Sequence, residues 1–123
     1  MAMERSGRAC ADAARNAAGL AQVEVVRSDV SAPALRRHLG TPDIVVLDPS
    51  REGAGTAVMR ALTAIQPAPR RIAYVACDPA SFARDLRVTL DAGWQLGSLR
   101  AFDMFPMTEH VELVALLDPP APS

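Results

Sequence analysis

The 123-residue sequence contains no lysine, so all of its positive side-chain charge rests on arginine. The 13 arginines stand against 14 acidic residues, which gives a formal net charge of −1 at pH 7. A protein that collects nucleic acid by electrostatics alone needs a clear excess of positive charge. The charge balance therefore counts against a free-standing RNA- or DNA-binding module.

Long apolar runs are also missing from the sequence. No stretch approaches the roughly 20 apolar residues that cross a bilayer as a helix. The first residues carry too many charged side chains for the apolar core of a secretion signal. Half of all residues are apolar, which suits one packed domain of this length. We therefore expect a cytoplasmic protein without a membrane partner.

Cysteine and histidine are scarce, with two residues of each kind. Cys10 and Cys77 lie far apart in the sequence, and a cytoplasmic location favours free thiols over a disulfide between them. Together with His38 and His110 they show no spacing typical of metal ligands. The sequence predicts no metal site.

A glycine-rich loop of the form Gly-x-Gly-x-x-Gly is absent as well. The hydrophobic periodicity instead alternates between helical and extended segments, and the first expected element is a helix. Helices are expected from about 6 to 18, from 31 to 39, around 58–65 and from 79 to 92. Strands are expected at about 23–26, 44–47, 72–76, 94–102 and 111–117.

This alternation predicts an α/β domain with a largely parallel sheet, in which strand 44–47 is buried on both faces. The last two strands have no helix between them and are expected to form an antiparallel pair at one edge. Phe82, Leu86 and Leu90 are expected to form the buried stripe of the last helix. The domain would span 1–118, followed by a proline-rich tail at 119–123.

Cys77 is the most prominent candidate for catalysis. It lies between the end of a strand and the N-terminus of a helix, where the helix dipole stabilises a thiolate. A cysteine in this position can act as a nucleophile, but most lone cysteines are small buried residues of the core. Placement alone leaves both interpretations open.

Carboxylates occur near the ends of two other strands, and ligands of such sheets bind beyond the carboxyl ends of the strands. Asp48 directly follows a strand, where it either holds an amino group or base edge or stabilises a turn. Glu112 lies near the start of the last strand. Burial there would raise its pKa and suit it to proton abstraction, whereas at a solvent-exposed edge it would have no such role.

Three ordered segments closely resemble motifs of the S-adenosylmethionine-dependent RNA (uracil-5-)-methyltransferases, which act on tRNA and 23S rRNA. The segments are Asp-Pro-Ser-Arg-Glu-Gly at 48–53, Tyr-Val-Ala-Cys-Asp-Pro-Ala-Ser-Phe-Ala-Arg-Asp-Leu at 74–86, and Phe-Asp-Met-Phe-Pro-Met-Thr-Glu-His-Val-Glu at 102–112. The resemblance covers essentially the whole chain. It implies a Rossmann-like class I methyltransferase sheet that lacks its first strand, with S-adenosylmethionine as cofactor and a uridine in tRNA or rRNA as substrate.

The resemblance also implies roles for the matching residues. Cys77 would attack C6 of the uracil, and Glu112 would remove the proton from C5. Asp48 would face both the cofactor and the target base, with Arg51 of the same motif also on the substrate. A uracil in folded RNA would have to be splayed out to reach them.

On the cofactor side, the resemblance implies two further carboxylates. Glu4 matches the residue that binds the ribose hydroxyls of S-adenosylmethionine, and Asp29 matches the position beside the adenine. The family's RNA-binding domain and its glycine-rich cofactor loop have no counterpart in this sequence. The departures within the motifs are mild, and they are Ser50, Ala76 and Met107.

Two alternatives to a catalytic RNA methyltransferase remain open. One is a non-catalytic remnant of the domain, in which the missing first strand leaves unpaired strand edges through which copies associate. The other is a cysteine-dependent hydrolase, which needs a histidine paired with Cys77, and only His110 is placed to supply one.

Overall fold

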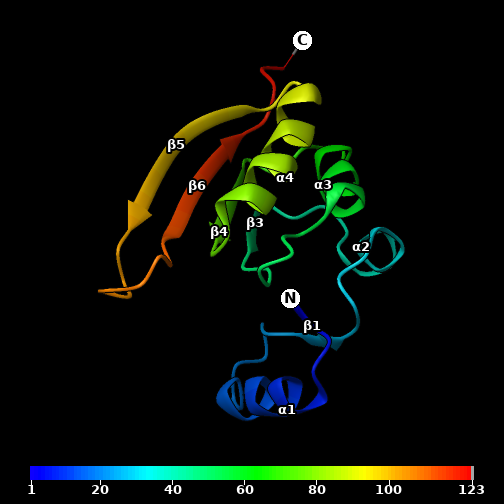
Figure 1. The fold of residues 1–123 in the computed structure, drawn as a ribbon. Coiled ribbons are helices and arrows are strands. Elements are labelled where there is room, and N and C mark those ends of the chain that lie inside the picture. The colour runs from blue at the N-terminus through cyan, green and yellow to red at the C-terminus, as the bar shows by residue number, and fades with distance from the viewer. Residues whose placement is uncertain (123) are drawn as a thin grey trace. The chain divides into compact units, whose positions relative to one another are not determined.

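A computed structural model describes residues 1–122 of the chain, which form two compact units that divide between Gly40 and Thr41. Figure 1 shows the course of the chain through both units. No helix in the described part is long and apolar enough to cross a membrane. Each unit has its own secondary structure and is described by itself.

The first unit combines two short parallel strands with two helices. Its elements are β1 (Ala2–Glu4), α1 (Gly7–Asn16), β2 (Val25–Arg27) and α2 (Ala32–His38). The expected helices and the expected strand are present, but a strand rather than a helix is the first element. Three residues are too few for a periodic pattern to reveal β1, which is recognised by its pairing with β2.

Both helices of this unit begin at the serines that the sequence indicates. The Oγ atom of Ser6 accepts a hydrogen bond from the backbone N–H of Ala9, and that of Ser31 accepts one from Ala34. These bonds satisfy N–H groups that have no partner inside the helix.

The second unit contains a four-stranded sheet in the order β3-β4-β6-β5. Its elements are β3 (Ile44–Leu47), α3 (Thr56–Thr63), β4 (Arg71–Ala76), α4 (Pro79–Asp91), β5 (Gln95–Phe102) and β6 (Glu112–Asp118). β3 and β4 are parallel, and β6 is antiparallel to both of its neighbours. The sheet is therefore mixed, and β6, the last strand in sequence, occupies an internal position.

The core of this unit lies between the sheet and the two helices, which pack side by side over one face (Figure 1). Ile72 and Tyr74 of β4 are buried, and they pair with buried Leu117 and Ala115 of β6. The ring of Phe82 from α4 packs edge-on against Tyr74, with 5.3 Å between the ring centroids. These contacts identify the face of β4 and β6 that meets the helices.

β3 differs from its prediction, because only one of its faces is covered within the second unit. Val45 is buried, whereas Ile44 is 54% and Val46 is 68% exposed. β3 is an edge strand of this sheet, and α3 and α4 lie on the side of Val45. The apolar sequence of β3 correctly indicates a strand, but the described residues leave its second face open.

The buried stripe of α4 also differs from its prediction. Phe82 is buried as expected and Leu86 is half-buried, but the fully buried positions that follow Phe82 are Asp85 and Thr89, and Leu90 is 42% exposed. The polar groups are tolerated in the core because they are hydrogen-bonded, as in the 3.0 Å bond from Thr89 Oγ1 to the carbonyl of Asp85. Hydrophobicity alone therefore selects the wrong face after the first turn.

Two leucine substitutions test this assignment of the core. Leu62 of α3 is fully buried, so Leu62→Ala should lower the free energy of unfolding of the second unit by about 2–5 kcal/mol. Leu90→Ala is the control and should cost about 0.5 kcal/mol or less, since Leu90 is half exposed. Urea unfolding followed by the fluorescence of Trp94, the single and buried tryptophan, measures both. Equal losses for the two variants would contradict the assignment.

Candidate active site

Three of the predicted site residues lie at one edge of the four-stranded sheet. β3, β4 and β5 run in the same direction and β6 runs against them, so the ends of the first three meet the start of β6. Asp48 directly follows β3, Cys77 directly follows β4, and Glu112 is the first residue of β6. The fold thus gathers groups from three separate parts of the sequence.

Cys77 and Glu112 adjoin the last pair of the ladder between β4 and β6. That pair is Ala76 with Leu113, and Cys77 follows Ala76 while Glu112 precedes Leu113. Both residues are half-buried, so solvent and a substrate can reach the thiol and the carboxylate at this end of the ladder.

Asp48 occupies the same position relative to β3 that Cys77 occupies relative to β4. Tyr74 and Leu47 are register partners, and Tyr74 faces the helices. Side chains alternate along strands, so both residues are expected on the face away from the helices if the alternation continues past each strand end. Asp48 is exposed at this position.

The N-terminus of α4 lies immediately after Cys77, as the sequence predicts. Asp78 is the N-cap, and its carboxylate accepts a 2.8 Å hydrogen bond from the backbone N–H of Ser81. This hydrogen bond is the largest of several effects that lower the pKa of Asp78. Pro79 occupies the first helical position. Cys77 and Cys10 are both free thiols.

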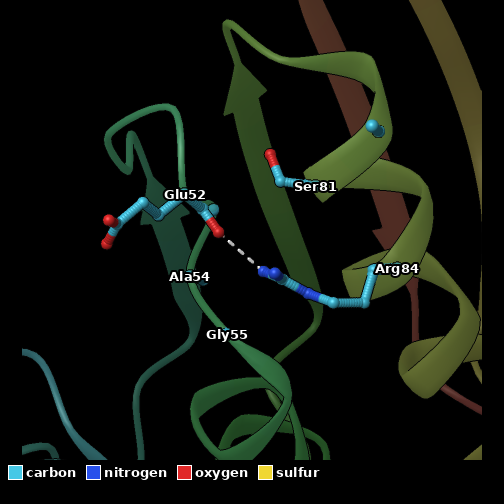
Figure 2. A pocket seen from close by; sticks show the side chains of 7 residues that line it. Glu52, Ala54, Gly55, Ser81 and Arg84 are labelled. Carbon is cyan, nitrogen blue, oxygen red and sulfur yellow. Dashed lines mark hydrogen bonds between the residues drawn. The ribbon is translucent and has the colours of Figure 1, made fainter.

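The loop after β3, residues 48–55, is hydrogen-bonded to α4 through its second half. Ser81 donates from Oγ to the carbonyl of Arg51 at 2.9 Å, and Arg84 donates to the carbonyl of Glu52 at 2.7 Å (Figure 2). Arg51 itself is exposed. The position of its backbone, and with it the predicted substrate contact, is thus set by the first turns of α4.

The far end of this loop is held by Asp85, whose side chain is completely buried. Its Oδ2 atom accepts hydrogen bonds from the backbone N–H groups of Ala54 at 2.8 Å and Gly55 at 3.1 Å. The hydroxyl of Tyr74 donates to the same oxygen at 2.6 Å. The guanidinium of Arg84 binds Oδ1 at 2.9 Å and balances the charge.

Gly53 is required where this loop approaches α4. Its φ of +79° lies in the region that favours glycine. A Cβ atom at this position would come within 2.7 Å of Oδ2 of Asp85 and 2.8 Å of a guanidinium nitrogen of Arg84. No side chain fits between the loop and the helix.

A hollow of about 650 Å³ opens beside this contact, between the loop and the first turns of α4 (Figure 2). Its lining residues are Glu52, Gly53, Ala54, Gly55, Ala80, Ser81 and Arg84. None of the predicted site residues lines it. The hollow is therefore a neighbour of the candidate site and not the place where Cys77 would act.

The two predicted cofactor carboxylates, Glu4 and Asp29, belong to the first unit. Glu4 ends β1, where its Oε1 atom accepts a 2.7 Å hydrogen bond from the N–H of Ser6. Asp29 follows β2 and forms a 3.8 Å ion pair with Arg5, with both side chains largely exposed. Because β1 and β2 are parallel, both carboxylates lie toward the same edge of their sheet. Free carboxylate oxygens there suit the hydroxyl and amino donors of an adenosine.

His110, the histidine required by a hydrolase, is exposed, and its backbone N–H is bonded to Thr108 Oγ1. Within residues 1–122, no hydrogen bond joins it to Cys77 and no group of three metal-binding side chains occurs.

Tyr74, Arg84 and Asp85 have no role in the predictions from the sequence, although all three lie in the second motif. The signal for Asp85 was its spacing of three residues from Phe82 and four from Thr89, on the face that proves to be buried.

Comparisons with known proteins decide the family. The model of the tRNA (uracil-5-)-methyltransferase family matches residues 38–119, about two thirds of the chain. The chain belongs to the tRNA (uracil-5-)-methyltransferase family. Streptomyces avermitilis has a relative named an RNA methyltransferase that is 45% identical over 121 residues. A Streptomyces coelicolor RNA methyltransferase is 44% identical over 121 residues.

Solved structures agree with the family assignment. A Pyrococcus abyssi tRNA (uracil-54, C5)-methyltransferase, solved with S-adenosyl-L-homocysteine, matches 94% of this chain with a TM-score of 0.65 and 30% identity. TrmN from Thermus thermophilus matches 95% of this chain and 35% of its own, with a TM-score of 0.72 and 20% identity, which supports the Rossmann-like methyltransferase fold alone.

The chain of this uracil-5-methyltransferase family member spans only part of the length of its relatives. The chain spans 28% of the Streptomyces avermitilis relative, 26% of the Streptomyces coelicolor relative and 28% of the Pyrococcus abyssi structure. In the two Streptomyces matches, 98% of this chain is covered. The similarity therefore extends through both units but reaches only about a quarter of each relative.

The enclosed phenol of Tyr74, the single tyrosine, provides a pH test of the Asp85 contacts. Burial, and then the hydrogen bond to Asp85, raise the pKa of Tyr74 above its ordinary value of 10.0. The unfolded chain therefore releases this proton first, so the free energy of unfolding should fall as the pH rises above about 10. Tyrosinate absorbance should appear at higher pH in the folded than in the urea-unfolded protein.

Tyr74→Phe is the control for this test, because it removes the titrating group and should remove its contribution to the pH dependence above pH 10. Titration of the folded protein near pH 10, as in the unfolded chain, would show that the phenol is not enclosed.

Proposed function

We propose that this chain carries the catalytic part of an RNA uracil-C5 methyltransferase, which transfers a methyl group from S-adenosylmethionine to a uridine in tRNA or rRNA. The single observation that supports the proposal is the antiparallel pairing of β4 with β6, whose last pair adjoins Cys77 and Glu112. A nucleophile and a base at one edge of the sheet, together with Asp48, are the groups that substitution at C5 of uracil needs.

Cys77 starts the reaction as a thiolate that adds to C6 of the uracil. The new S–C6 bond breaks the conjugation of the ring and leaves an enolate-like carbon at C5. The N-terminus of α4, which begins two residues after Cys77, favours the negative charge on sulfur. Bound S-adenosylmethionine would supply the electrophilic methyl group to C5, and the sulfonium would leave as the thioether S-adenosylhomocysteine.

Glu112 completes the reaction by removing the proton from C5. The electron pair of that C–H bond re-forms the C5–C6 double bond, and Cys77 leaves as a thiolate. One carboxylate placed beside the sulfur serves this step, because C5 and C6 are adjacent atoms of the ring. The placement of Cys77 and Glu112 next to the last pair of the β4–β6 ladder is consistent with that requirement.

Asp48 and Arg51 are proposed to hold the target base, and Glu4 and Asp29 the adenosine half of the cofactor. Asp48 and Arg51 are exposed on the loop after β3, from which polar side chains can bond the edge of a uracil. The carboxylate of Glu4 keeps one oxygen free for ribose hydroxyls. The base must leave its stack to reach these groups, so the substrate is a loop or otherwise accessible uridine.

Trapping with 5-fluorouridine tests the nucleophile. Fluorine at C5 cannot leave as a proton does, so a tRNA transcript containing 5-fluorouridine, incubated with the cofactor and the chain, should form a stable adduct visible as a denaturation-resistant band. Cys77→Ala should abolish the adduct, and Cys10→Ala should leave it unchanged. Absence of an adduct with the unaltered chain would refute autonomous catalysis and favour the non-catalytic remnant.

Substitution of the proposed base tests the second half of the reaction. With ordinary uridine RNA, Glu112→Gln should still allow attack and methyl transfer but slow proton removal by about 100-fold or more. The methylated RNA should then remain attached to Cys77, which mass spectrometry of the protein detects. Normal release of methylated RNA from this variant would exclude Glu112 as the base, and Glu109→Gln, an exposed neighbour in the preceding loop, is the control.

A further inference from the structure

One face of α4 connects the nucleophile to the substrate-binding loop. Ser81, Arg84 and Asp85 are spaced three and four residues apart, so they lie on the same face of the helix. Together they bind the loop at Arg51, Glu52 and the following turn. The same helix begins two residues after Cys77.

Asp85 is the fully buried member of this face. Its fully buried charge depends on five hydrogen bonds, two from the guanidinium of Arg84, one from Tyr74 and two from the backbone of Ala54 and Gly55. No buried side-chain polar atom in the described part of the chain lacks a partner. If the loop moves away, the carboxylate loses two donors in a site that water does not reach.

We propose that Asp85 is a positioning residue for the reaction, which fixes the loop that carries Asp48 and Arg51 relative to Cys77. The proposal rests on the function proposed above. Asp85 does not touch the substrate and acts through the backbone N–H groups of Ala54 and Gly55. α4 thus connects Cys77, which precedes it, to the loop that carries Asp48 and Arg51.

The loop and α4 are closely packed against each other at Gly53. A Cβ atom on Gly53 would already overlap Asp85 and Arg84, so the loop lies against the helix at backbone distance. A misplacement of about 1 Å can cost on the order of 100-fold in rate when reacting groups must be aligned. A loop held at this distance by a buried charge defines such an alignment.

The first experiment measures the loop directly and needs no RNA. Asp85→Asn in the full chain keeps the size of the side chain but removes the charge, and hydrogen exchange should become about tenfold faster for the amides of Ala54 and Gly55. Asp91→Asn is the matched control on the same helix, because Asp91 is exposed and contacts only Arg87 among the described side chains. It should leave the exchange of the loop unchanged.

The second experiment measures the rate constant and the amplitude of adduct formation with the 5-fluorouridine tRNA transcript. Asp85→Asn should lower the rate constant at subsaturating RNA by about tenfold or more, while the fraction of protein that reacts stays the same. A purely structural role would lower the reacting fraction and leave the rate constant unchanged. Asp91→Asn should change neither quantity.

Tyr74→Phe keeps the experiment decisive if Asp85→Asn does not fold. This variant removes one of the five donors to Asp85 and the 3.0 Å hydrogen bond that the Tyr74 hydroxyl accepts from the N–H of Ala54. The charge of Asp85 and its two bonds from the loop stay in place, so exchange and adduct rate should shift in the same directions by about threefold.

Unchanged exchange in the loop would overturn the proposal, and so would faster exchange with an unchanged adduct rate. If the unaltered chain forms no adduct, the proposed function fails, and the exchange measurement still decides whether Asp85 holds the loop.

Discussion

The carboxylate of Asp85 brings a full negative charge into the interior of the second unit, and the surrounding structure is arranged to compensate it. Burying an ion is unfavourable unless it is paired and hydrogen-bonded. Here the compensation comes from β4 through Tyr74, from α4 through Arg84 and from the loop after β3 through two backbone N–H groups. One charge thereby links three elements, and Gly53 is needed because the loop must come close to reach it.

Much of the fold follows from the sequence because its signals are local. The serine caps at Ser6 and Ser31 and the Asp78-Pro79 start of α4 depend only on neighbouring residues, and all three are present. The cover on each face of β3 depends on residues far away in the sequence, and a run of apolar residues cannot report it. The face of α4 was misassigned for a related reason, since hydrophobicity does not show that a buried Asp85 has its partners.

The candidate site likewise contains residues that local sequence signals indicate and residues that they do not. Cys77 is conspicuous in the sequence because it stands between a strand and a capped helix. Glu112 is not, since nothing local distinguishes a buried base from an edge carboxylate. Only the pairing of β4 with β6 sets the two residues together. The motifs supplied this pairing indirectly by resemblance, whereas no signal in the sequence pointed to the hydrogen bonds between α4 and the loop.

The internal place of β6 has a consequence for how the site is assembled. β6 follows β5 in the sequence yet lies between β5 and β4, so β5 has no partner in this sheet until β6 enters. Pairing of segments distant in sequence is slow, because the chain between them must be closed first. During synthesis, Cys77 emerges before Glu112, because β4 precedes β6 in the sequence. A chain interrupted after β5 retains Cys77 but lacks both Glu112 and the strand that joins β5 to β4, so the proposed site and the sheet are completed by the same segment.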